Sequence, residues 1–176
     1  MTGLPDSWGA TPAELQAGYR CDELAPDGHR LVRAVTSAAA APEVYRWLCQ
    51  LRVAPYSYDW LDNFGRTSPR RLVPGLEELA AGQRVMTIFE LVHHTPGRDL
   101  TVTIRPGVAE QVFGPVAVTY RVIATPGGSR LVAVLRIGHR QDGRMSSVRR
   151  RLLAWGDLLM MRKQLLTLAR LAEAGG

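Results

Sequence analysis

Two polar side chains interrupt an apolar stripe near the end of the chain, and both could orient or act on a bound molecule. Asp157 and Gln164 are seven residues apart, so on a helix they share a face with Leu153, Met160 and Met161. A carboxylate in a closed apolar core is costly unless it is paired. Asp157 is therefore predicted either to face a hollow, where water or a ligand meets it, or to pair with an arginine from a strand.

The second group of candidate residues lies in an aromatic segment that is predicted to be a loop. Four of the twelve aromatic residues fall between Ala54 and Arg70, and Pro55, Gly65 and Pro69 interrupt the same stretch. Core aromatics normally lie on regular helices or strands, so this crowding needs another explanation. The four residues are Tyr56, Tyr58, Trp60 and Phe64.

The elements that must position these residues follow from hydrophobic periodicity. Residues 29–36 are predicted to form a strand and 41–51 a helix. The pattern then changes to period two, and short turns containing Pro-Gly separate two pairs of β-rich runs, which indicates antiparallel hairpins. The four runs are Arg84–His94, Asp99–Pro106, Pro115–Ala124 and Ser129–Arg140, and a long helix over 146–174 closes the chain. An antiparallel sheet covered by this helix gives an α+β fold.

The closing helix has two apolar stripes where an amphipathic surface helix needs one. Such a helix is buried on two sides, or is buried on one side and faces a cavity or a partner chain on the other, which leaves a homodimer open. One stripe holds Val148, Leu152, Trp155, Leu159 and Leu166, and the other holds Leu153, Met160, Met161, Leu168 and Leu171.

The net charge of +6 raises the question of an anionic partner. Seven basic and two acidic residues lie between Arg144 and Gly176, which accounts for five of the six net charges. Arg149, Arg150 and Arg151 stand in the first turns of the closing helix, where cations oppose the helix dipole. The sequence leaves two interpretations open, a solvated face and a patch that binds an acidic partner; nucleic acid is not expected.

Motifs for cofactor or metal chemistry are absent from the sequence. It has no Gly-rich phosphate loop, no His-Glu-x-x-His, no paired Cys-x-x-Cys and no Gly-x-Ser-x-Gly. His93 and His94 are neighbours in a predicted strand and point to opposite faces. We predict no metal and no cofactor, while an acid/base enzyme that uses Asp, Glu, Arg or Tyr stays open.

Charged residues also interrupt the β-runs, on the face opposite the most apolar one. They are predicted to form a solvent-facing arginine ladder on the outside of the sheet, or else to anchor the polar end of a bound molecule. They are Glu90, Arg105, Arg121 and Arg136.

The chain is expected to be one domain, residues 29–176, preceded by an arm over residues 1–28. The first residues lack a basic and apolar leader, and the apolar closing stretch carries charges that exclude a membrane span, so we expect a cytoplasmic protein. Cys21 and Cys49 do not indicate a disulfide framework.

The order of elements resembles the START-like, Bet v 1-like superfamily, in which a curved antiparallel sheet wraps around a long C-terminal helix. Residues 35–69, "VTSAAAAPEVYRWLCQLRVAPYSYDWLDNFGRTSP", are similar to the first strand, first helix and following loop of bacterial SRPBCC proteins of the polyketide cyclase/dehydrase-like kind. Residues 152–173, "LLAWGDLLMMRKQLLTLARLAE", resemble their closing helix. The resemblance covers about residues 29–174 and implies a hollow between sheet and helix.

The resemblance implies a ligand pocket and a role for the aromatic segment as its lid or wall, whereas the plainer alternative is that these aromatics pack the helix–sheet junction. The resemblance and the basic residues of the closing helix together leave three functions open. The first is binding of a lipid, polyketide or isoprenoid-like molecule. The second is a cyclase, aromatase or dehydratase with Asp157 as acid or base and Tyr58 as donor. The third is an interaction module that binds an anionic surface through Arg149–Arg151. The expected ligand contacts are Tyr56, Tyr58, Trp60, Phe64, Leu153, Asp157, Met160, Met161 and Gln164.

Overall fold

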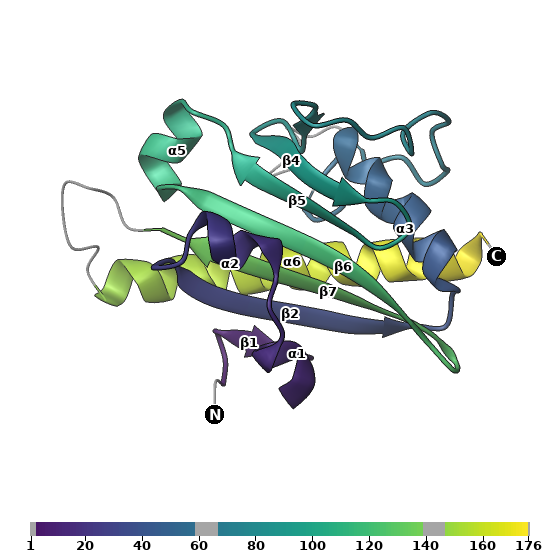
Figure 1. The fold of residues 1–176 in the computed structure, drawn as a ribbon, viewed down its shortest axis with the longest axis horizontal. Helices are drawn as coiled ribbons and strands as arrows, with labels where there is room; N and C mark the ends of the chain where they lie inside the picture. The colour runs from purple at the N-terminus through teal and green to yellow at the C-terminus, as the bar shows by residue number, and fades with distance from the viewer. Residues whose placement is uncertain (1–2, 59–66, 139–146, 176) are drawn as a thin grey trace.

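A single sheet organises the fold (Figure 1). The computed structural model describes residues 3–58, 67–138 and 147–175. Within them, seven strands lie in the order β1-β2-β7-β6-β5-β4-β3, and every pair is antiparallel except β1 and β2. Their bounds are β1 Ser7–Trp8, β2 His29–Ser37, β3 Arg84–Val85, β4 Phe89–Thr95, β5 Asp99–Ile104, β6 Val116–Thr125 and β7 Gly128–Ile137.

The predicted α+β class and the hairpins are confirmed. β4 and β5 are joined by a tight turn, and so are β6 and β7. The second turn requires glycine at 128, because its φ is +142° and a Cβ there would lie 2.2 Å from the carbonyl oxygen of Ser37. The turn at Gly128 therefore seats the β6–β7 hairpin against the end of β2.

One run that was predicted as a single strand is interrupted, so this prediction is wrong. The run Arg84–His94 is two strands, β3 and β4, which pair with each other as a short hairpin. Met86 and Thr87 between them adopt positive φ values of 46° and 64°. Non-glycine residues rarely take this conformation, so the composition of the run gives no sign of the reversal.

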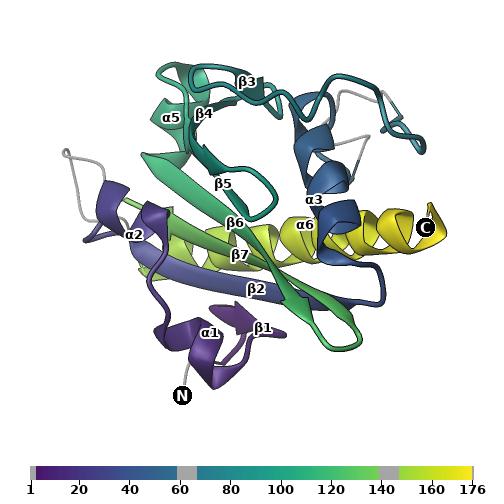
Figure 2. The ribbon, with the colours of Figure 1, turned by 45° about the vertical axis from the view of Figure 1, so that its right-hand side comes forward.

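The helices divide between the two faces of the sheet. α3 (Ala41–Cys49) continues into a 3₁₀ turn (Gln50–Arg52) and packs against β6, β7 and α6 (Ser147–Ala174). α6 also contacts β2. Figure 2 shows the sheet curving from β2 to β4, with α3 and α6 together on one side of it. α5 (Val108–Phe113), which the sequence did not predict, connects β5 and β6.

α6 buries one face, and its two predicted stripes have different environments. The buried face consists of Ala154, Leu158, Met161, Gln164, Leu165, Leu168, Ala169 and Ala172. The predicted stripe that carries Asp157 lies at or beside this face, whereas Leu152, Trp155 and Leu159 of the other stripe are exposed. The helix is therefore buried on one side, and the open side carries an apolar line.

The N-terminal arm covers the outer face of the sheet, opposite α6. Its β1 extends the sheet, α1 (Pro12–Gln16) lies beside β1, and α2 (Arg20–Leu24) lies against β5, β6 and β7 (Figure 1). α1 begins with Thr11 as N-cap and Pro12 at the first helical position. A small apolar cluster joins arm and sheet: Tyr19, Cys21, Val32, Ala34, Ala117, Val132 and Val134.

The arm changes the interpretation of the arginines on the strands. Arg121 and Arg136 do lie on the outer face, but they are not solvent-facing, since their side chains are 19% and 18% exposed. The Arg121 guanidinium lies 4.3 Å from the centre of the Tyr19 ring. Arg136 Nε donates to Asp22 Oδ1 at 2.7 Å. These arginines hold the arm on the sheet, so the predicted solvent-facing ladder is wrong at Arg121 and Arg136.

Candidate functional site

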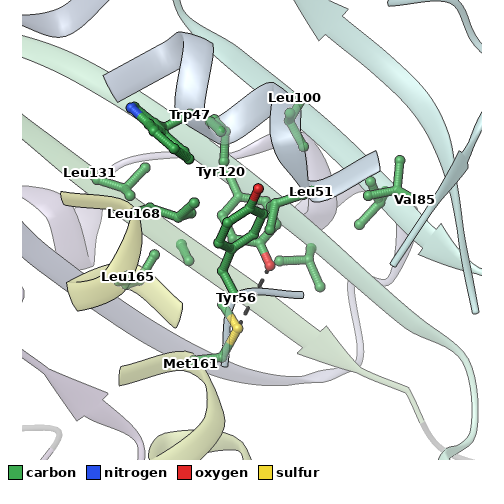
Figure 3. Packing of buried hydrophobic residues seen from close by; sticks show 14 of the residues in the cluster. Trp47, Leu51, Tyr56, Val85, Leu100, Tyr120, Leu131, Met161, Leu165 and Leu168 are labelled. Atoms are coloured by element: carbon green, nitrogen blue, oxygen red, sulfur yellow. Dashed lines mark hydrogen bonds between the residues drawn. The ribbon is translucent and has the colours of Figure 1, made fainter. Parts of the chain in front are cut away.

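The segment after α3 brings Tyr56 into the core between the sheet and α6. Tyr56 is 1% exposed, and its ring meets the Trp47 ring edge-on, with centroids 6.1 Å apart. Figure 3 shows it surrounded by side chains from α3, the sheet and α6. Its φ is +56°, an unusual value for a tyrosine. The chain therefore bends sharply at Tyr56, and this bend directs the ring inward.

Gln164 is the polar centre of this region. Tyr120 Oη on β6 donates to Gln164 Oε1 at 2.7 Å, and Gln164 Nε2 donates to the Pro55 carbonyl at 2.7 Å. The same nitrogen lies 3.2 Å from Met86 Sδ. One buried amide thus joins α6 to the sheet and to the segment after α3. Burial raises the pKa of the Tyr120 hydroxyl, which stays protonated as a donor.

Asp157 pairs with an arginine from the sheet, one of the two predicted alternatives. Arg33 on β2 is fully buried, and its Nη2 donates to Asp157 Oδ2 at 2.9 Å. Arg33 Nη1 donates to the carbonyl oxygens of Asp6 and Val32 at 2.8 and 3.1 Å. Arg33 Nε has no acceptor among the described residues. The guanidinium therefore links the arm, the edge of the sheet and α6.

Burial disfavours the charged form of both residues in the pair. Burial raises the pKa of Asp157 from 3.8 to about 6, although the Arg33 charge and hydrogen bond oppose the rise. Burial also lowers the pKa of Arg33, and Asp157 opposes that shift. Both shifts have the same cause, the loss of hydration that the ion pair compensates in part.

The other residues predicted to contact a ligand differ in how deeply they are buried. Met161 is buried, with its Sδ 3.7 Å from Tyr120 Oη (Figure 3), whereas Tyr58, Leu153 and Met160 are half-buried. Trp60 and Phe64 lie outside the described residues. The structure thus brings Tyr56, Met161 and Gln164 together around Tyr120. It places Asp157 one helical turn from Met161, on Arg33.

Sequence reasoning missed the partners in these contacts. Arg33 shares the inner face of its strand with Leu31 and Val35, so a charge among apolar alternate positions was the available signal. Strand alternation places Tyr120 with Val118 and Val122 on the apolar face, in agreement with the structure, but it gives the hydroxyl no role. Met86 gave no signal, because it lies at the unpredicted reversal.

Other reactive groups in the described residues offer little chemistry. Cys21 and Cys49 are buried free thiols with raised pKa values, about 12 for Cys49, which burial keeps protonated. No group of three or more His, Cys, Asp or Glu side chains in the described ranges is placed to hold a metal. Among the same residues, no helix combines the length and apolarity that crossing a membrane requires.

Comparison with solved structures identifies the fold. The chain superposes on protein MLL2253 from Mesorhizobium loti with a TM-score of 0.54 and 18% identity, over 84% of this chain and 98% of that one. It superposes on Ara h 8.0201 with a TM-score of 0.52 and 11% identity, over 83% and 98%. The fold is the START-like, Bet v 1-like helix-grip fold.

A third solved structure similar to this chain is the Zhui aromatase/cyclase from Streptomyces sp. R1128. It matches with a TM-score of 0.51 and 16% identity, over 84% of this chain and 98% of that one. No sequence-family model matches the chain, and no curated protein matches it. The resemblance predicted from the sequence is therefore confirmed at the level of the fold, and these identities carry no activity with them.

Proposed function

We propose that the protein binds a hydrophobic or amphipathic small molecule, such as a lipid, polyketide or isoprenoid, between the sheet and α6. The observation that carries the proposal is the setting of Gln164. It is a buried amide fixed by Tyr120 and Pro55, with Met86 Sδ 3.2 Å from its nitrogen and Met161 Sδ 3.7 Å from the Tyr120 hydroxyl. Ligand sites in proteins have this composition, mostly apolar walls with a few fixed polar groups. The helix-grip fold typically serves hydrophobic-ligand binding, which supports the proposal by analogy.

The proposed contacts differ in role. Leu153, Met160 and Tyr58 are half-buried and would contact the ligand directly, while Tyr56 and Met161 lie deeper and would form the floor. Trp60 and Phe64 remain proposed as contacts from the aromatic segment. Gln164 would orient a polar end of the ligand. Asp157 would act through Arg33, whose charge it balances.

Two neighbouring residues on α6 give a matched test. Met160 is half-buried on the proposed ligand side, and Leu159 is 57% exposed on the opposite side. Met160→Trp adds bulk where the ligand would lie and should weaken binding of the probe 1-anilinonaphthalene-8-sulfonate by about tenfold or more. Leu159→Trp introduces the same side chain on the exposed side of α6 and should leave the affinity for the probe unchanged. Equal affinities in both variants, with native circular dichroism, would count against the proposal.

A second candidate function is acid/base catalysis of cyclisation or dehydration, with Asp157 as acid or base and Tyr58 as donor. The observation that favours it is the Asp157 carboxyl, whose pKa burial raises to about 6, close to the value that suits proton transfer near neutral pH. Incubation with a linear poly-β-ketone thioester would test it. Cyclised product from the natural protein but not from Asp157→Asn would support catalysis, and unchanged substrate in both would oppose it.

A further inference from the structure

An exposed apolar line runs along the open side of α6. Leu152, Trp155 and Leu159 are 68%, 40% and 57% exposed and follow one another at spacings of three and four residues. They lie opposite the buried face that contains Leu158 and Leu165. We call these three residues the exposed ridge. Isolated exposed apolar residues are common, but three in line on one helix form a continuous surface.

The exposed charged side chains described on α6 beside the ridge are all cations. From residue 151 to residue 163, where every side chain is described, the exposed charged residues are Arg151, Arg162 and Lys163. The single carboxylate in this stretch, Asp157, turns inward to Arg33. Arg162 lies 5.3 Å from the centre of the Trp8 ring on the arm, so a second tryptophan borders the ridge. The open side of α6 is thus both apolar and positively charged.

We propose that this side of α6 docks on an anionic lipid surface, with the exposed ridge entering the headgroup region and the cations contacting lipid phosphates. A helix that lies in a membrane interface has this distribution, Leu and Trp on one line and Lys or Arg beside it. Tryptophan is favoured at that depth. A second copy fits less well, because pairing this face with itself would bring two cationic clusters together without a carboxylate between them.

The position of the ridge allows docking without disturbing the core. α3 packs against α6 beyond the exposed ridge, and the arm covers the far face of the sheet (Figure 1). Docking therefore needs no rearrangement of the described fold. It is also independent of whether a small molecule occupies the interior.

Vesicle binding tests the proposal. We expect the protein to co-sediment with phosphatidylcholine vesicles that contain one third phosphatidylglycerol at least about tenfold more strongly than with phosphatidylcholine alone, and to be released by salt. Tryptophan emission should shift to the blue on binding, and brominated lipids should quench it. The quenching should fall in Trp155→Phe, whose chain keeps Trp8, Trp47 and Trp60.

Two pairs of variants separate the apolar and electrostatic contributions. Leu159→Ser should weaken binding to the anionic vesicles, whereas Leu24→Ser, at a 45% exposed leucine on the arm, should not. The double variant Arg162→Gln/Lys163→Gln should weaken it by about ten- to thirtyfold. Arg70→Gln/Arg71→Gln removes the same charge from two other exposed sites and should have a much smaller effect.

Several outcomes would overturn the proposal. No binding to anionic vesicles would do so, and so would equal binding to neutral ones or equal losses in the test and control variants. A homodimer that Leu159→Ser dissociates, without vesicle binding, would assign the ridge to a second copy. An acidic protein bound through Arg162 and Lys163, again without vesicle binding, would assign it to that partner. If Leu159→Ser does not fold, the comparison of Arg162→Gln/Lys163→Gln with Arg70→Gln/Arg71→Gln decides whether the proposal stands.

Discussion

Arg33 and Asp157 form an ion pair, with 2.9 Å between Nη2 and Oδ2, that joins the second strand to the closing helix across 124 residues of sequence. The arginine is fully buried and the carboxylate nearly so, with 13% of its side chain exposed. The other hydrogen bonds of Arg33 go to backbone carbonyls, and the charge of Asp6 acts on it in addition to that of Asp157.

Removal of the arginine should be strongly destabilising. Arg33→Met keeps much of the side-chain volume but leaves the Asp157 carboxylate buried without its cation. The expected loss is about 3–5 kcal/mol in the free energy of unfolding at neutral pH. Replacing both residues, Arg33→Met with Asp157→Leu, should recover most of that loss, because no charge is then left buried. Urea denaturation of the two variants measures both values, and a double variant as unstable as the single one would contradict this explanation.

The pair should also make stability depend on pH between about 4 and 6. The folded-state pKa of Asp157 is raised from 3.8 to about 6, so in this window the folded protein holds a proton that the unfolded chain has released. Stability contributed by this group is therefore present at low pH and declines as the pH rises through about 6, by at most about 3 kcal/mol.

Asp157→Asn isolates this contribution, because its side chain stays neutral at every pH. The free energy of unfolding of this variant, relative to the natural protein, should rise between pH 4 and pH 6. Asp27→Asn, at an exposed position, is the control and should follow the natural protein. Parallel profiles for all three proteins would show that Asp157 does not titrate in this range.

The amide at Gln164 should be needed for stability as well as for orientation. Gln164→Leu leaves the Tyr120 hydroxyl and the Pro55 carbonyl without the partners they have now, at a cost of about 2–3 kcal/mol. Tyr120→Phe removes one donor and should cost less, about 1–2 kcal/mol. Chemical denaturation orders the two variants, and a neutral Gln164→Leu would mean that the network contributes no net stability.

The arm should detach when its central carboxylate is removed. Asp22 accepts hydrogen bonds from Arg136, Arg30 and the Tyr19 amide. Burial raises the pKa of Asp22, but these bonds outweigh it and the net pKa is lowered, so its contribution is present at neutral pH and lost in acid. Asp22→Ala should cost about 2 kcal/mol and speed proteolysis within residues 3–28. Asp27→Ala is the matched control, and equal cleavage of both variants would contradict the role of Asp22.

The fold was predictable because its signals are local. Period-two runs and Pro-Gly turns indicate the β4–β5 and β6–β7 hairpins, and the long apolar pattern indicates α6. The β3–β4 reversal was missed, since it depends on Met86 and Thr87 taking a conformation that their side chains disfavour. α2 and α5 have five and six residues, too few for a helical period to show.

For each contact in the site, the sequence predicted one of the two residues and not its partner. Asp157 and Gln164 were found as polar residues within an apolar stripe of a single helix. Their partners Arg33 and Tyr120 lie on strands 124 and 44 residues away, and no spacing rule joins such pairs. Docking of the arm depends on similar distant pairs, such as Asp22 with Arg136, so its residues gave no indication that they cover the sheet.

Native mass spectrometry, beside the mass of the denatured chain, tests ligand binding most directly. Protein purified from its native host without denaturation should carry a non-covalent hydrophobic molecule that denaturation releases. The added mass should be lost in Met160→Trp and kept in Leu159→Trp. A native mass equal to that of the bare chain, together with no binding of 1-anilinonaphthalene-8-sulfonate, would contradict a ligand site between the sheet and α6.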